Sequence, residues 1–271
     1  MENNKRGFSH LRISFTARMS QVLVCTKSIL ARRCCYAKIS ILGVCIIYTI
    51  SCQPAEVDKA EDLINMSIEA HGGMERWKSL DTFSYRKEIT LYDTEKKVRK
   101  FIAQQHDYTR SPQLEGRYSY FDSIQRAVVF DGKTAYKIEA NTKKEADESA
   151  LKNFSSAYYV LNMPWKLHDE GAHATYQGLD TLFDGRIVEK IKVEYTSGIT
   201  KDLWWYYFDT NTHRVVACLV SHPPTYNLIT NDAYATYQGL LWNHKRSSYR
   251  ADKNGDVIHL LGTYVYVYPN D

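Results

Sequence analysis

The chain beyond residue 52 has almost no cysteine. Six cysteines occur in 271 residues, and Cys218 is the only one that follows Cys52. A single thiol forms no internal disulfide, and no Cys-x-x-Cys pair is present to bind zinc. Cys218 stands in the apolar run VVACLV, so we expect a small buried hydrophobic side chain rather than a reactive nucleophile.

An excess of positive charge is also missing from this part of the chain. The formal net charge is +4, from 35 basic and 31 acidic residues, but residues 1–52 contain eight of the bases and one of the acids. The remainder carries 27 bases and 30 acids, a net charge of −3. A nucleic-acid-binding protein places its basic residues on the folded domain. We therefore expect no nucleic-acid partner.

The apolar run that follows the basic N-terminal region is too short to span a membrane comfortably. Ile39–Ile50 contains twelve mostly apolar residues, whereas a spanning helix needs about 20. A basic region, an apolar core of about 7–15 residues and then a small residue are typical of a secretion signal. Ser51 supplies the small residue, and Pro54 ends any helix that begins earlier. We interpret residues 1–51 as a leader.

Common catalytic motifs are absent as well. The sequence has no G-x-S-x-G, no P-loop and no H-E-x-x-H. His168, Asp169, Glu170 and His173 offer enough donor atoms for zinc, but their spacing does not match a helical pair of ligands. We assign no catalytic residue, metal ligand or cofactor. A metal-dependent hydrolase that uses a loop over residues 168–173 stays open as an alternative.

A helical pattern follows the leader. Apolar residues at helical spacing predict one amphipathic helix over about residues 56–70. Gly72-Gly73 predicts its end, because glycine accepts the left-handed conformation. His71 then lies in the last turn, where we expect a partly charged imidazole that caps the helix rather than a ligand. A short second helical piece is predicted over Met74–Leu80.

Beyond Asp81 the period of the apolar residues changes to two, which is typical of strands. Strands are predicted at 83–91, 117–121, 127–130, 136–138, 187–195, 203–208, 215–220 and 264–268. Asp131-Gly132 and Asn254-Gly255 predict hairpin turns. Thr142–Leu161 predicts one helix that packs on the sheet. Together these patterns predict an α+β fold, in which a curved antiparallel sheet forms a half-open β-barrel packed on the N-terminal helix and the inserted helix.

Aromatic residues are concentrated after the leader. All five Trp and nineteen of the 21 Tyr lie beyond residue 52. Aromatic residues favour strands, so ordinary sheet packing explains them. They also suit the wall of a concave site for an apolar ligand, because tyrosine joins an apolar body to a polar tip. If the strand over 203–208 is regular, only one of Trp204 and Trp205 faces inward.

Several segments together resemble a known family. SIEAHGGMERWKSLDTFSY, YYVLNMPWKLHDEGA, the two YQG pieces and YYFDTNTHRV resemble uncharacterised lipoproteins of Bacteroidota-type bacteria. That family is similar in fold to the lipoprotein-localisation factors (LolA/LolB-like), in which a curved antiparallel half-barrel wraps around helices. The resemblance covers nearly all of residues 56–271. It implies a fold and a cell-envelope compartment, and no characterised activity.

The end of the leader resembles a bacterial lipoprotein signal. In such signals the cysteine after the cleavage point is acylated and becomes the N-terminus, and the matching residues are Thr49–Cys52. Thr49 departs from the common pattern, which has leucine there. The resemblance implies lipidation of Cys52, a lipidated tether over residues 52–56 and a single half-barrel domain over 57–271. Ordinary cleavage or an uncleaved anchor is the alternative, and Met19 is an alternative start.

These inferences predict a lipid-anchored envelope protein that faces the periplasm. It would contact the membrane through its anchor and bind a lipid, another apolar ligand or a lipoprotein in an aromatic-lined half-barrel. Gln53 is not the aspartate that retains some lipoproteins at the inner membrane, which favours the outer membrane. Besides the hydrolase, a structural envelope component that binds a protein partner remains an alternative.

Overall fold

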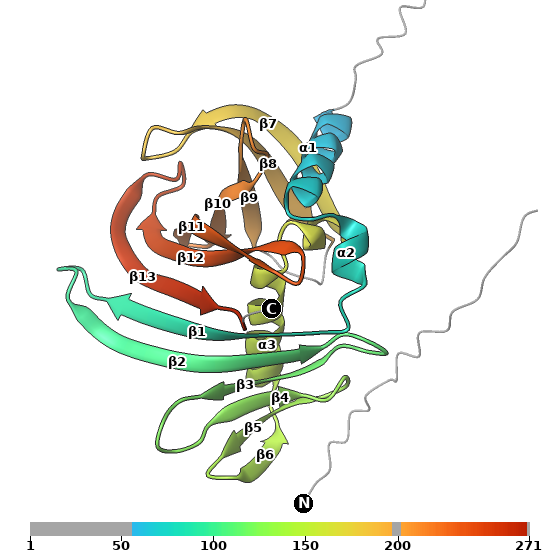
Figure 1. Cartoon of the computed structure of the whole chain (residues 1–271). Helices are drawn as coiled ribbons and strands as arrows, with labels where there is room; N and C mark the ends of the chain where they lie inside the picture. The colour runs from blue at the N-terminus through green and yellow to red at the C-terminus, as the bar shows by residue number, and fades with distance from the viewer. Residues whose placement is uncertain (1–55, 197–201, 270–271) are drawn as a thin grey trace, which may run out of the picture. The chain divides into compact units, whose positions relative to one another are not determined.

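The computed structural model describes residues 56–196 and 202–269 (Figure 1). The predictions about the leader, the tether and Cys52 concern residues outside this range. No helix in the described ranges combines the length and the apolar composition that crossing a bilayer requires.

Two helices open the described chain, as the sequence predicts. α1 (Glu56–Ala70) is followed by α2 (Met74–Lys78). Gly72 and Gly73 between them have φ angles of 104° and 87°, and the Gly73 N–H donates to the carbonyl oxygen of Ile68 at 2.9 Å. This bond helps to satisfy one of the last carbonyls of α1, which also accepts from the His71 N–H at 3.1 Å. The predicted glycine stop is therefore confirmed.

Thirteen strands form one antiparallel sheet (Figure 1). They are β1 (Thr82–Tyr92), β2 (Val98–Thr109), β3 (Glu115–Tyr120), β4 (Ala127–Phe130), β5 (Ala135–Glu139), β6 (Thr142–Ala146), β7 (Ala172–Thr181), β8 (Ile187–Tyr195), β9 (Leu203–Asp209), β10 (Val215–His222), β11 (Thr225–Tyr237), β12 (Leu240–Ala251) and β13 (Val257–Val267). Their order in space is β6-β5-β4-β3-β2-β1-β13-β12-β11-β10-β9-β8-β7. Because β6 and β7 are unpaired edges, the curved sheet is not closed. The predicted α+β fold with a half-open barrel is confirmed.

One helix and a short 3-10 turn connect the two edge strands. α3 (Glu148–Leu161) and η1 (Trp165–His168) lie between β6 and β7 in the chain. The side chains of α3 that are buried recur about once per turn and are Ala150, Phe154, Tyr158 and Leu161. α3 therefore packs with one face on the sheet, as an amphipathic helix should.

The predicted start of this helix is wrong. Thr142–Ala146 is the edge strand β6 and not the first part of the helix. Ala140 and Asn141 both have positive φ, at 48° and 62°, and Glu139 pairs with Thr142 across them. Two successive residues with positive φ make the tight turn that joins two strands of a hairpin. The tertiary pairing with β5 therefore overrides the helical propensity of the charged residues.

The two faces of the sheet carry separate hydrophobic cores. We call the face that α1 and α3 cover the inner face; its core joins residues of both helices to the strands. A smaller core lies on the opposite, outer face of β8 to β12 and includes Tyr207, Leu219 and Leu228. Trp204 packs against the inner core and Trp205 against the outer one. The predicted alternation of the two tryptophans is therefore confirmed.

Candidate binding site on the inner face

The predicted histidine loop is a short turn over residues 169–171, and His168, Asp169 and His173 line one cavity of about 340 Å³ beside it. His168 ends η1, where its Nε2 lies 2.8 Å from Oδ1 of Asn65. His173 lies on β7, and its Nε2 is 3.1 Å from Oγ1 of Thr196. Within the described ranges no three His, Cys, Asp or Glu side chains come together in an arrangement that could hold a metal ion. The residues of the hydrolase alternative thus form no metal site there.

His71 is a buried structural residue, and its predicted charge is wrong. Only 2% of the residue is exposed, and Nδ1 lies 2.8 Å from the carbonyl oxygen of Ser67. The Leu241 N–H donates to the His71 carbonyl at 3.0 Å and ties the end of α1 to β12. Burial lowers the pKa of His71 to about 4, so the imidazole is neutral. The residue positions the helix end, but it does so without a charge.

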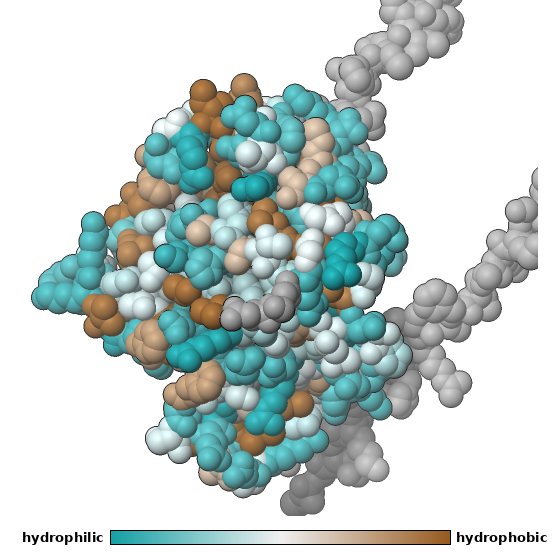
Figure 2. Space-filling view, in the orientation of Figure 1, coloured by the Kyte–Doolittle hydropathy of each residue, from teal (hydrophilic) through white to brown (hydrophobic). Residues whose placement is uncertain are grey.

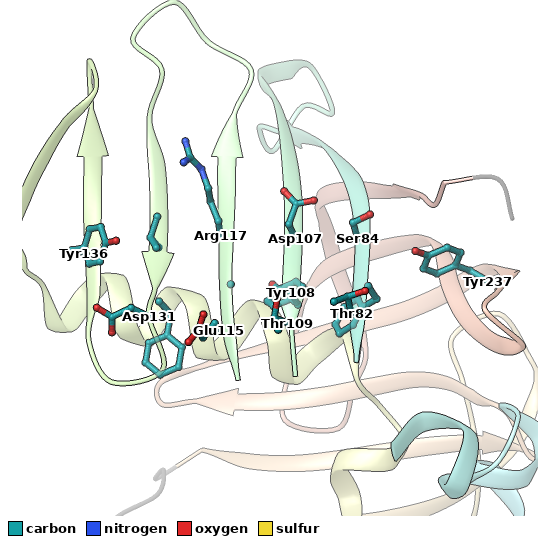
Figure 3. Close-up of a pocket in the computed structure, with 14 residues that line it drawn as sticks. Thr82, Ser84, Asp107, Tyr108, Thr109, Glu115, Arg117, Asp131, Tyr136 and Tyr237 are labelled. Carbon is teal, nitrogen blue, oxygen red and sulfur yellow. The ribbon is translucent and has the colours of Figure 1, made fainter. Parts of the chain in front are cut away.

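A cavity with a mixed polar and apolar lining lies beside the first five strands. It has a volume of about 570 Å³ and opens over the ends of β1 to β5 (Figure 3). One row of its lining residues runs straight across five paired strands: Ser84, Asp107, Arg117, Val129 and Tyr136. Phe83 and Tyr108, which alternate with this row, belong to the inner core. Because Phe83 and Tyr108 also line the cavity, its lining combines side chains from both faces of the sheet.

Two carboxylates of this groove are already engaged by their own strands and turns. Gln105 Nε2 donates to Asp107 at 3.1 Å, and the backbone N–H groups of Lys133 and Thr134 donate to Asp131. The groove mixes charged, hydroxyl and aromatic side chains, whereas a site for an apolar ligand has a mostly apolar lining.

Aromatic rings line the inner face instead. The ring centroids of Tyr85 and His106 lie 4.6 Å apart, and those of Trp165 and Trp242 lie 5.2 Å apart. Further rings that belong to the inner core are Phe83, Tyr108, Tyr118, Phe154, Tyr158, Tyr206, Phe208, Tyr237 and Tyr266. These residues come from α3, η1 and seven different strands. They form an aromatic wall within the core that the helices cover, which fits the ordinary sheet packing that the sequence predicts.

α3 fills the space over this wall. The ring of Tyr158 lies 5.4 Å from Tyr108, and Phe154 lies 5.0 Å from Phe130. On the side of the molecule drawn in Figure 2, hydrophobic residues are scattered in small groups among hydrophilic ones. The inner face is thus a covered surface in this conformation and not an open channel.

One small cavity remains beneath the C-terminal part of α3. Its volume is about 10 Å³, enough for one water-sized group. It is lined by Val160, Met163, Trp204, Tyr206, Val215, Cys218, Asn231, Asn243 and Arg246. Cys218 is buried as predicted, and burial raises the pKa of its thiol. Arg246 is the unexpected member, because a charged residue is rarely buried without a partner.

Polar atoms around this cavity lack hydrogen-bond partners among the described residues. They include Nε of Arg246, Oδ1 of Asn231 and Oη of Tyr206. A buried polar atom without a partner costs about 1–3 kcal/mol. Most buried polar atoms in proteins have a hydrogen-bond partner. The interface between α3 and the sheet therefore has more buried polar atoms without a partner than an ordinary core.

Residues 37–222 match a protein family that is described as a family of unknown function (DUF6503). The chain belongs to this family. No curated protein matches the chain. The resemblance to an uncharacterised family that the sequence suggests is thereby confirmed.

Solved structures are similar to this DUF6503 chain in fold. A domain from Vibrio parahaemolyticus named for outer membrane lipoprotein sorting has a TM-score of 0.53 and 10% identity, over 79% of this chain and 92% of its own. A LolA superfamily protein from Nitrosomonas europaea has a TM-score of 0.52 and 8% identity, over 78% of this chain and 94% of its own. A DUF1329 family protein from Desulfovibrio piger has a TM-score of 0.51 at 9% identity, over 80% of this chain and 92% of its own. These likenesses confirm the predicted similarity to the fold of lipoprotein-localisation factors.

Proposed function

We propose that this DUF6503 protein is a lipid-anchored protein of the cell envelope whose inner face binds the acyl chains of a lipid or a lipoprotein. The observation that carries the proposal is an inserted helix lying over an aromatic face with unsatisfied polar atoms beneath it. The name of the Vibrio structure, which refers to lipoprotein sorting, supports the same ligand class.

An acyl chain can compete energetically with α3 for the inner face. Burial of a large apolar side chain contributes about 1.5–3 kcal/mol, so Phe154, Tyr158 and Leu161 together contribute about 5–9 kcal/mol. Each buried methylene contributes about 0.8 kcal/mol, so a chain of about ten methylenes contributes a similar amount. A ligand of ordinary acyl length could therefore replace the apolar face of α3 without a large change in free energy.

The sequence supports an anchor close to the domain. Only Gln53, Pro54 and Ala55 separate Cys52 from the first residue of α1. A fully extended chain spans at most about 3.6 Å per residue, so an acylated Cys52 would hold α1 within about 15 Å of the membrane. Several acyl chains on one residue anchor a protein stably, whereas a single chain is marginal. In this proposal residues 1–51 are removed, 52–56 form the tether and 57–271 form the domain.

Acyl labelling of the full-length protein in a bacterial host tests the anchor. We expect the wild type to take up radiolabelled palmitate and to fractionate with the outer membrane, as Gln53 favours. Cys52→Ala should lose both properties, and Cys45→Ala, the cysteine within the apolar run, should lose neither. Equal labelling of Cys52→Ala and wild type would refute the anchor.

Mass spectrometry of an organic extract tests the ligand. We expect residues 53–271, expressed in bacteria and purified without detergent, to release stoichiometric lipid. The same protein should bind a fluorescent acyl probe after the lipid has been removed. A chain that releases no lipid and binds no acyl probe would rule out the proposed binding function, whatever the state of Cys52.

A further inference from the structure

Two cations lie on the inner face of the central strands. Arg246 on β12 is 5% exposed and pairs with Tyr264 on β13. Lys87 on β1 pairs with Tyr266, the next residue on the same face of β13. The Nζ atom of Lys87 lies 5.3 Å from the ring centroid of Tyr264 and 5.6 Å from that of Tyr266. The two tyrosines therefore stand between two positive charges.

Among the described residues no carboxylate forms an ion pair with Arg246. The groups that act on its charge are the phenols of Tyr266 and Tyr264 and the thiol of Cys218. The ion pairs found in the described parts of the chain involve other residues. A buried cation is normally paired or bonded to an anion, because removing a charge from water is costly. The positive charge of Arg246 is therefore not neutralised by a carboxylate among the described residues.

The pKa of Tyr266 indicates a positive electrostatic potential at this position. Burial acts to raise the pKa of its phenol, but the charges of Lys87 and Arg246 outweigh burial and lower it. A site that favours the anionic form of a tyrosine also favours the anion of a ligand. The small cavity beneath Val160 and Met163 lies beside Arg246, whose Nε atom has no hydrogen-bond partner among the described residues.

We infer that the ligand of the inner face is an acidic amphiphile, with a carboxylate or phosphate at one end of its acyl chain, and that Arg246 binds this oxyanion. This inference rests on the proposed binding function. Arginine suits the role because its planar guanidinium donates two parallel hydrogen bonds to carboxylate or phosphate oxygens. Lys87 adds a second positive charge at the same site. The acyl chain would lie against the aromatic wall that α3 covers.

The test uses one chain length with three headgroups. Every described helix and strand and both cores lie after residue 55, so residues 53–271 contain the whole described fold. Delipidated protein is titrated with dodecanoate, dodecyl phosphate and dodecanol by calorimetry. We expect at least one of the two anions to bind about tenfold or more tightly than the neutral alcohol. Comparison of the two anions distinguishes a fatty acid from a phosphate-bearing lipid.

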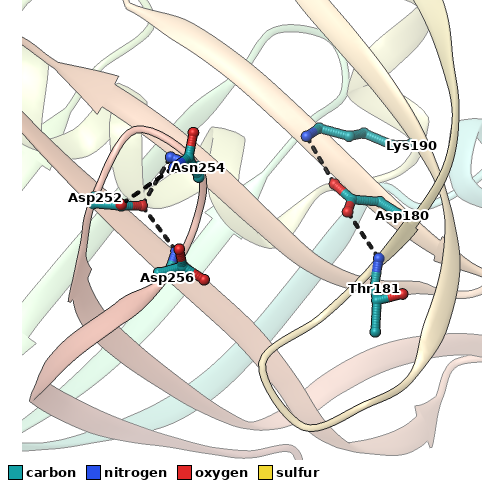
Figure 4. A network of polar contacts seen from close by, with 6 residues as sticks. All are labelled: Asp180, Thr181, Lys190, Asp252, Asn254 and Asp256. Atoms are coloured by element: carbon teal, nitrogen blue, oxygen red, sulfur yellow. Dashed lines mark hydrogen bonds and ion pairs between the residues drawn. The ribbon is translucent and has the colours of Figure 1, made fainter.

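Substitutions then assign the preference to residues. Arg246→Met should remove the preference for the anion over dodecanol; an apolar residue of similar volume is tolerated at many buried ionic sites. Lys87→Gln changes a partly exposed residue and should reduce the preference severalfold in a folded protein. Lys190→Gln is the matched control, because Lys190 also lies over a tyrosine ring but is paired with Asp180 at 2.9 Å (Figure 4).

The outcomes separate the two proposals. If all three probes bind with equal affinity, or if Lys87→Gln and Arg246→Met both leave the preference unchanged, the headgroup inference is wrong and the binding function stands. If no probe binds the wild type, both are overturned. Loss of preference in Lys190→Gln would also contradict the inference, because a general change in net charge would then explain the effect.

Discussion

Oδ1 of Asp147 accepts a hydrogen bond from the Ser149 N–H at 2.7 Å and thereby caps the helix that covers the inner face. The same oxygen accepts from Ala150 at 3.3 Å, and Lys137 forms an ion pair with the carboxylate. Asp147 follows directly after β6, so the cap joins the edge of the sheet to the start of α3. Asp147 therefore stabilises the start of α3, and substituting it tests how firmly the helix is held on the sheet.

Asp147→Ala should loosen α3 without disturbing the sheet. Loss of an N-cap shifts a helix equilibrium by about fivefold. We expect faster hydrogen exchange over residues 148–161 and about fivefold tighter binding of an acyl probe, since less work is needed to displace the helix. Asp209→Ala is the control, because Asp209 accepts similar bonds from Asn211 and Thr212 in the β9–β10 turn. Equal effects of both variants on probe binding would contradict the covering role of α3.

Cys218 should report the opening of α3. Its thiol is buried beneath the helix, and it is the only cysteine after Cys52. Because burial raises its pKa, it should react slowly with a thiol reagent in the native protein and rapidly in urea. Asp147→Ala should accelerate the native reaction severalfold, and Asp209→Ala should not. A thiol that reacts rapidly in the native wild type would show that the inner face is not covered in solution.

Acidification should destabilise the protein through its buried histidines. Burial lowers the pKa of His71 to about 4 and that of His106 to about 2, whereas an unfolded histidine has a pKa of about 6.5. The unfolded state binds more protons between these values, so stability is full above pH 6.5 and falls as the pH decreases toward 4. The contribution of His71 over this window is about 3 kcal/mol.

Urea unfolding between pH 7 and pH 5 measures this effect. In wild type the free energy of unfolding should decrease by about 1.4 kcal/mol per pH unit for each of the two histidines once the pH is below about 6. His71→Gln keeps a polar side chain near the Ser67 carbonyl but does not titrate, so its slope should be about half as steep. Parallel curves for the two proteins would show that His71 is not buried in its neutral form.

Gly72 should resist substitution more strongly than a glycine in an open turn. A Cβ atom at Gly72 would lie 2.7 Å from the carbonyl oxygen of Gly239, and its φ is 104°. Gly185 has a φ of 85° but no atom within 4 Å of such a Cβ. Positive φ costs an L-residue about 1–2 kcal/mol. Gly185→Ala should therefore lose about that amount of unfolding free energy and Gly72→Ala clearly more, as measured by urea unfolding. Equal losses would show that α1 and the β11–β12 turn are not in close contact.

The local elements of the fold were largely predictable from the sequence. Val57 to Ala70 carries a helical period, Gly72 and Gly73 stop it, and most strands carry a period of two. β2, β7, β11 and β12 were not among the predicted strands. In β2 the first four side chains are all exposed and give no alternation. β6 was predicted as helix, because its charged residues favour a helix locally and only pairing with β5 overrides that preference.

The candidate site was predictable only in part. The sequence marks Trp204 and Trp205 as alternating residues, and it shows Lys87 as a polar interruption of an apolar strand face. Nothing near Arg246 in the sequence distinguishes it from an exposed arginine, since HKRSS is a polar segment. Its burial depends on Tyr264 from the neighbouring strand and on Val160 and Met163 from a segment more than 80 residues earlier.

The sequence by itself determined the charge distribution, the few cysteines, the period of each element and the α+β class, because these depend on neighbouring residues in the chain. Only the tertiary structure decided which face of the sheet is covered, where the aromatic rings meet and that Arg246 lies buried with no carboxylate paired to it among the residues that the structure describes. Burial and desolvation arise from residues that are distant in the chain, and they convert an ordinary arginine into a candidate anion-binding residue.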